Sequence, residues 1–90
     1  IRKEHKYQVK MTKDLRKWRK KIDRVDKKLE KLLAKREKLV VEIGKIKKSK
    51  DLDVEQLSRE KEVFSKIKNP RTKRIFKEII KISKESQSKL

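Results

Sequence analysis

The sequence predicts an all-α chain of three helices, one long and two shorter. Apolar residues recur at alternating steps of three and four through residues 15–46, the spacing that places side chains on one face of a helix. The pattern breaks at residues 49–53 and again at Asn69-Pro70, where proline cannot donate a backbone N–H. We therefore expect helices at about residues 14–48, 53–68 and 71–89.

The first predicted helix carries an arginine within its apolar stripe. The apolar members of the stripe are Leu15, Trp18, Ile22, Val25, Leu29, Leu32, Leu39, Ile43 and Ile46. Arg36 occupies the only position of this series that is not apolar. A guanidinium in a packed seam must pair with an anion or bind a ligand, because burying an unpaired charge is costly. Gly44, later in the same helix, would allow another chain or a ligand to approach closely.

The second predicted helix begins after an aspartate cap. Asp51 or Asp53 can accept backbone N–H bonds, and Gln56 stands three residues after Asp53, as in a capping box. The third predicted helix follows the Asn69-Pro70 break, and its polar Ser83 and Gln87 fall on the face of its isoleucines. Each helix thus presents an apolar stripe with a few polar members.

The composition limits the binding partners and structural classes that are possible for this chain. Thirty-two Lys plus Arg against 14 Asp plus Glu give a net charge of +18, which attracts nucleic acid, an anionic membrane or a small polyanion. The absence of cysteine excludes disulfides and thiolate metal sites, and no apolar run approaches the ~20 residues that span a bilayer. We expect one domain with a thin core, in a cytoplasmic protein. The basic residues 1–13 lack periodicity and form an extension, disordered or continuous with the first helix.

The polar members of the stripes have two interpretations. In a coiled-coil polar layer, Arg36 would pair with Glu60 and fix the register of the helices. In a ligand site, Arg36 and Lys47 would hold opposite ends of a small anion, because they lie three turns apart on nearly the same face. Arg19 lies about 25 Å before Arg36 along the axis, so it would join such a site only from a second, antiparallel chain.

Several short motifs, taken in order, resemble the all-helical chorismate mutases. The first helix has an arginine before Ile22-Asp23-x-x-Asp26, followed by Leu-Leu-Ala-x-Arg36 and Ile-Gly-Lys-x-Lys47. Downstream are Ser58-Arg59-Glu60, and Ile75-Phe76 followed by Ser83 and Gln87. The resemblance covers about residues 15–90 and implies an intertwined homodimer with two sites, in which residues 14–90 form the chorismate mutase domain.

The resemblance also implies a role for each matched residue. Arg36 and Arg19 of the partner subunit would bind substrate carboxylates, with Arg59 and Ser83 in support. Lys47 and Gln87 would contact the ether oxygen, and Glu60 would accept the ring hydroxyl. Gln56 stands where many members carry an acidic residue near that hydroxyl, and its other interpretation is a helix cap. The stretch between Glu60 and Phe76 is shorter than in the family, which implies a truncated second helix or a missing loop.

The implied reaction fits the residue types. Conversion of chorismate to prephenate, a step toward phenylalanine and tyrosine, is a unimolecular rearrangement, so no nucleophile, metal or cofactor is expected. Fixed cations would hold the dianion in its reactive shape and stabilise charge on the ether oxygen. Two alternatives stay open. One is a related lyase that releases pyruvate from isochorismate, against which Glu60 argues; the other is a basic helical module that binds nucleic acid.

Overall fold

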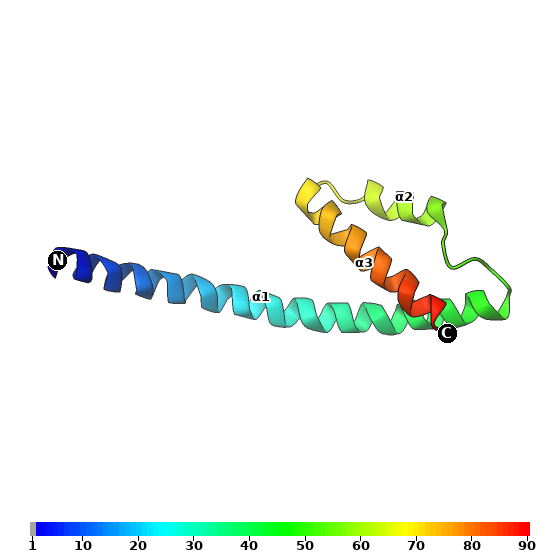
Figure 1. Cartoon of the computed structure of the whole chain (residues 1–90), viewed down its shortest axis with the longest axis horizontal. Coiled ribbons are helices and arrows are strands. Elements are labelled where there is room, and N and C mark those ends of the chain that lie inside the picture. The colour runs from blue at the N-terminus through cyan, green and yellow to red at the C-terminus, as the bar shows by residue number, and fades with distance from the viewer. Residues whose placement is uncertain (1) are drawn as a thin grey trace. The chain divides into compact units, whose positions relative to one another are not determined.

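The computed structural model describes the backbone of residues 2–90 and the side chains of residues 12–90. Over this part of the chain it contains three α-helices and no strand, as predicted. The helices are α1 (Arg2–Ser49), α2 (Leu57–Ser65) and α3 (Pro70–Ser88) (Figure 1). The chain divides into two units, Ile1–Ala34 and Lys35–Leu90, and each is described by itself.

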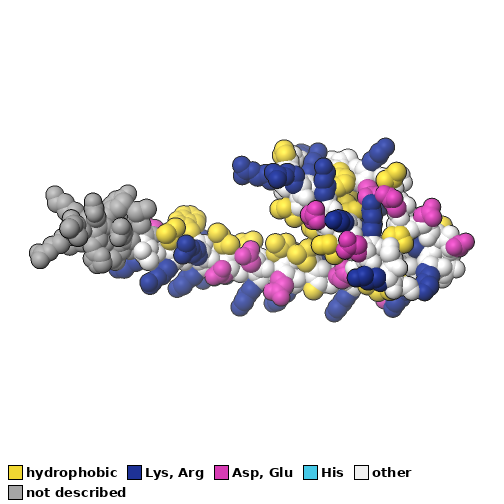
Figure 2. Space-filling model, in the orientation of Figure 1, with side chains coloured by type: hydrophobic (Ala, Val, Ile, Leu, Met, Phe, Trp, Pro, Cys, Tyr) yellow, Lys and Arg dark blue, Asp and Glu magenta, His cyan; other side chains and the backbone are white. Residues whose placement is uncertain are grey.

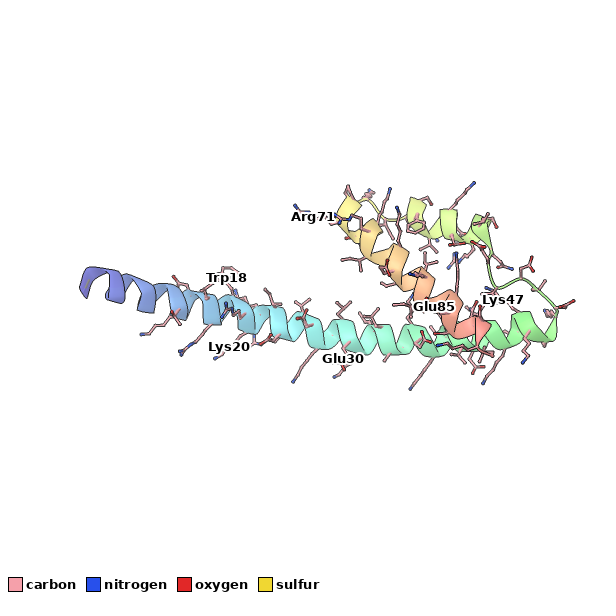
Figure 3. All side chains as sticks on the ribbon, viewed as in Figure 1. Trp18, Lys20, Glu30, Lys47, Arg71 and Glu85 are labelled. Atoms are coloured by element: carbon pink, nitrogen blue, oxygen red, sulfur yellow. The ribbon has the colours of Figure 1, made fainter. Side chains whose placement is uncertain are left out.

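The first unit is the N-terminal part of α1, which begins at Arg2 and not near residue 14. The backbone of residues 2–13 therefore continues the first helix, since Lys and Arg are good helix formers and no Gly or Pro interrupts the stretch. Apolar side chains form a row on this helix (Figure 2). Trp18 is 60% exposed, and Trp18 and Lys20 point to opposite sides of the helix (Figure 3). This face of the single chain is open to solvent.

The second unit is built from the end of α1 together with α2 and α3 (Figure 1). Its two buried apolar side chains are Val40 of α1 and Ile80 of α3. Asn69 caps α3 by accepting a hydrogen bond from Arg71 N at 2.8 Å, and Pro70 takes the first helical position, where a missing N–H costs nothing. The Asn-Pro pair thus starts α3, whereas α2 already ends at Ser65, before the predicted end near residue 68.

Gly44 lets α3 approach α1 closely. A Cβ at this position would lie 2.7 Å from Leu90 Cδ1 and 2.9 Å from Gln87 Cγ, both closer than atoms can pack. The close approach that the sequence suggested for Gly44 is therefore made by α3 of the same chain. It places Gln87 directly against α1.

The second helix is shorter than predicted. It spans Leu57–Ser65, with Gln56 at the N-cap making no side-chain capping bond, so the expected Asp53–Gln56 capping box does not form. Leu52 N instead donates to Lys47 O at 2.7 Å, and Asp51 adopts a positive φ of 53°, which aspartate tolerates. These interactions turn the chain sharply after α1 and keep residues 52–56 out of the helix. The helix is nine residues long, and both a truncated second helix and a missing loop remain predictions for the short stretch before Phe76.

Much apolar surface stays exposed on the single chain. Along α1, the exposed fractions of Val25, Leu29 and Leu32 are 62%, 50% and 63%. None of the helices described is long and apolar enough to cross a membrane. The stripe predicted from the sequence is present, and within one chain it has no packing partner over most of its length.

Candidate functional site

The second unit contains a pocket of about 310 Å³ bounded by the end of α1, the connection after it, α2 and α3. This volume lies at the lower end of the range usual for small-molecule sites. The pocket is lined by Arg36, Val40, Ile43, Lys47, Val54, Gln56, Arg59, Glu60, Val63, Ile80, Ser83, Lys84 and Gln87. Seven of the eight residues predicted for a site are therefore brought together here.

Arg36 lies in the pocket wall beside α3. Its Nη1 donates to Ser83 Oγ at 2.5 Å, and Ser83 Oγ donates in turn to Ile79 O at 2.8 Å. The serine hydroxyl thus fixes the arginine while leaving most of the guanidinium donors for another acceptor. The ion pair between Arg36 and Glu60, which a coiled-coil polar layer would require, is not formed.

Lys47 and Gln87 form a hydrogen-bonded pair. Lys47 Nζ donates to Gln87 Oε1 at 2.9 Å and to Val54 O at 2.8 Å. Gln87 Nε2 donates to Val40 O at 3.0 Å. Lys47 has three N–H donors and the amide of Gln87 has two, so each retains one N–H beyond these bonds. The pair presents two fixed donors on one wall of the pocket.

Glu60 is the acidic residue of the pocket lining. Its side chain is 19% exposed, and Oε1 accepts an ion-paired hydrogen bond from Lys84 Nζ at 2.7 Å. Oε2 is buried and has no hydrogen-bond partner within the described part of the chain. Because an unpaired buried acceptor is unfavourable, this oxygen is suited to a donor supplied by a ligand.

Lys84 also reaches the connection before α2. Its Nζ lies 3.1 Å from Glu55 Oε1, a carboxylate whose side chain is 61% exposed. The hydrogen bond to Glu60, and then that to Glu55, holds the pKa of the Lys84 ammonium above its ordinary value of 10.5. Lys84 thus stays charged and joins α3 to the two segments facing it.

Arg59 and Gln56 occupy the α2 side of the pocket. Arg59 Nη1 forms an exposed ion pair with Glu62 at 3.0 Å, an interaction that solvent weakens. Gln56 is both a lining residue and the N-cap residue of α2. Gln56 therefore stands both where a substrate contact and where a helix cap were predicted, although its side chain makes no capping bond.

The chain matches the family model for chorismate mutase type II over residues 18–88. It is a member of the chorismate mutase type II family. The match spans most of the chain and includes all eight of the residues predicted for the site. No curated protein and no solved structure matches the chain.

Arg19 of this chorismate mutase family member lies in the first unit and is not a lining residue of the pocket. The pocket of a single chain holds four basic side chains, from Arg36, Lys47, Arg59 and Lys84. The described residues offer no cluster of three or more His, Cys, Asp or Glu side chains for a metal ion.

Sequence reasoning missed Lys84. It lies four residues after Ile80 and three before Gln87, so helical periodicity places it on the same face of α3 as both. That spacing indicates a position on the pocket face, but lysine is so common in this chain that spacing alone does not single out Lys84. The carbonyl of Val54 was also missed, because backbone acceptors have no sequence signature.

Proposed function

We propose that this chain catalyses the rearrangement of chorismate to prephenate. The observation that carries the proposal is the Lys47–Gln87 pair, joined at 2.9 Å in the wall of the pocket that also holds Arg36. Membership of the chorismate mutase type II family supports the same activity. The pocket supplies fixed donors on one wall and an acceptor oxygen on Glu60, as a dianion with a ring hydroxyl requires.

The reaction breaks one C–O bond and forms one C–C bond within the same molecule, and no proton is gained or lost. Catalysis therefore depends on holding the flexible dianion in its reactive shape and on stabilising charge as it develops. Arg36 would bind a carboxylate, and its bond to Ser83 restricts the guanidinium before substrate arrives. This restriction lowers the entropy cost of binding.

Negative charge grows on the ether oxygen as the C–O bond breaks. The remaining N–H groups of Lys47 and Gln87 would donate to this oxygen, and both side chains are already held by bonds to Val54 O and Val40 O. Donors fixed in advance need no reorganisation at the transition state, and one such donor contributes about 3 kcal/mol.

The ring hydroxyl would donate to Glu60 Oε2, the buried oxygen that has no partner among the described residues. Gln56 and Arg59 would make supporting contacts from α2. A hydroxyl that satisfies a buried acceptor contributes strongly to specificity, because an analogue lacking it leaves the acceptor unpaired. Glu60 thus favours chorismate over isochorismate in this proposal.

The complete site would require a second chain. We propose a homodimer in which the apolar stripe of α1 packs against a partner and Arg19 of the partner subunit adds a cation to the pocket. Exposure of Trp18, Val25, Leu29 and Leu32 supports this proposal, because the stripe is unpartnered in one chain. The cytoplasmic location and the role in phenylalanine and tyrosine synthesis stay predictions.

A direct assay tests the activity. Purified protein is incubated with chorismate, and substrate loss and prephenate formation are followed by absorbance and chromatography. We expect prephenate without pyruvate. In a parallel incubation with isochorismate, pyruvate release would point to the lyase instead. An inert protein that shifts DNA at low salt, with affinity falling steeply as salt rises, would favour the nucleic-acid-binding module.

A further inference from the structure

Lys84 is the one strongly paired cation of the pocket. Its side chain is 31% exposed, whereas every side chain in the Lys45–Glu42, Arg59–Glu62 and Lys66–Glu62 ion pairs is more than half exposed. Lys84 Nζ bonds Glu60 Oε1 at 2.7 Å. The other oxygen of the same carboxylate is the unpartnered Oε2. One ammonium therefore holds one end of the carboxylate group that carries the free acceptor.

A glutamate side chain has three rotatable bonds, so its carboxylate is positioned only if something restrains it. Within the described structure, no side chain of α1 or α2 donates a hydrogen bond to the Glu60 carboxylate. The restraint comes from Lys84 on α3, a helix that also carries the buried Ile80, and Lys84 is held in turn by its second bond to Glu55. Removing the ammonium would free the carboxylate to rotate.

We infer that Lys84 is a positioning residue that fixes Glu60 so that Oε2 accepts the ring hydroxyl of the substrate. The inference rests on the proposed chorismate mutase activity and extends it to a residue with no predicted role. Lys84 does not contact the reacting bond. It selects for substrates that carry the hydroxyl, because the carboxylate that it orients has no other donor.

The other charged groups that line the pocket, or that share Lys84 with Glu60, come from every element around the pocket. They are Arg36 and Lys47 of α1, Glu55 of the connection, Arg59 of α2 and Lys84 of α3. The other three cations bond different groups. Arg36 donates to Ser83, Lys47 donates to Gln87 and Val54 O, and Arg59 donates to Glu62. Of these cations only Lys84 bonds the carboxylate of Glu60.

A purely structural role gives a different expectation. If Lys84 only ties α3 to α2, its loss would loosen the pocket and lower the turnover of every substrate equally. If Lys84 positions Glu60, its loss would affect only substrates whose hydroxyl uses Glu60. An analogue of chorismate with a methyl group on the ring hydroxyl oxygen separates the two roles, because its oxygen has no proton to donate.

The test compares kcat/KM for chorismate and for the methylated analogue in wild-type protein, Lys84→Met and Lys84→Arg. For Lys84→Met we expect about a tenfold loss with chorismate, the usual size when a charge-assisted hydrogen bond is lost, and less than a twofold change with the analogue. Lys84→Arg should recover most of the chorismate activity. In a Glu60→Gln background, Lys84→Met should have no further effect on either substrate.

Lys81→Met is the matched control, since Lys81 is an exposed lysine of the same helix and does not line the pocket. Equal losses on both substrates, or additive losses in the double variant, would overturn the role of Lys84 while leaving the mutase activity intact. A wild-type protein that leaves chorismate unchanged would instead overturn the proposed function, and the positioning role with it.

Discussion

Gly44 and Gln87 touch across the contact between α1 and α3. A methyl group at Gly44 would lie 2.9 Å from Gln87 Cγ, so the residue proposed to donate to the ether oxygen packs against bare backbone. Gln87 also donates to Val40 O, one turn earlier on α1. Packing against α1 and hydrogen bonding to it together set the position of this side chain.

Gly44→Ala is predicted to lower activity more than stability. Alanine gains about 1 kcal/mol in helix propensity, which offsets part of the roughly 1–3 kcal/mol of overpacking. The displaced Gln87 should cost about tenfold in kcat/KM, because small shifts of a donor weaken transition-state contacts. Chorismate kinetics and urea unfolding measure the two effects. Unchanged kinetics would show that Gln87 does not depend on this contact.

Lys47→Met is predicted to lower kcat by at least about a hundredfold, the size of loss when one fixed donor to a developing oxyanion is removed. The loss should appear in kcat more than in KM, because the ether oxygen gains charge only in the transition state. Lys45→Met serves as the control, since the Lys45–Glu42 pair is exposed and contributes little. Comparable losses in both variants would argue for a general charge effect.

Mixed dimers test the shared site. Arg19→Ala and Arg36→Ala chains should each be nearly inactive, and unfolding and refolding them together should restore roughly a quarter of the wild-type activity. Half of the dimers would be mixed, and each mixed dimer would have one complete site of two. Each variant refolded alone is the control. Absence of recovery, with mixed dimers demonstrated, would exclude a site shared between chains.

Leu29→Lys is predicted to dissociate the proposed dimer, because it places a charge in the exposed apolar row of α1. Helical content and unfolding temperature should then fall, and both should depend on protein concentration in the wild type. Analytical ultracentrifugation and circular dichroism make the measurements. Glu30→Lys is the control, since Glu30 points away from the Trp18 side of the helix (Figure 3). A wild-type monomer would remove the basis for this prediction.

The Lys84 pair should contribute to stability with a specific pH dependence. Because the folded state raises the pKa of Lys84 above 10.5, the contribution is fully present below that pH and is lost as pH rises through the higher folded pKa. The difference in urea midpoint between wild type and Lys84→Met should therefore be constant near neutrality and shrink above about pH 10.5. A difference that stays constant to high pH would mean that it does not come from the charge.

The number and type of helices were predictable from the sequence, but the residues at which they begin and end were less so. The three-four spacing and the Asn69-Pro70 break determined three helices, because periodicity and proline act locally. The start of α2 was missed since Asp53 satisfies the local rule for a cap, whereas Lys47 bonding to Val54 O holds that segment in another conformation. A contact between distant residues overrode the local preference.

By itself, the sequence determined which side chains interrupt the apolar stripes, and so which residues were worth testing as a site: Arg36, Lys47, Glu60, Ser83 and Gln87. Only the tertiary structure decided how they pair. In the folded chain Arg36 donates a hydrogen bond to Ser83, and Glu60 forms an ion pair with Lys84. Oε2 of Glu60 has no partner within the described residues. Helical spacing fixes the face on which a residue lies, but pairing depends on where two helices cross, and here Gly44 allows the close approach of α3 to α1.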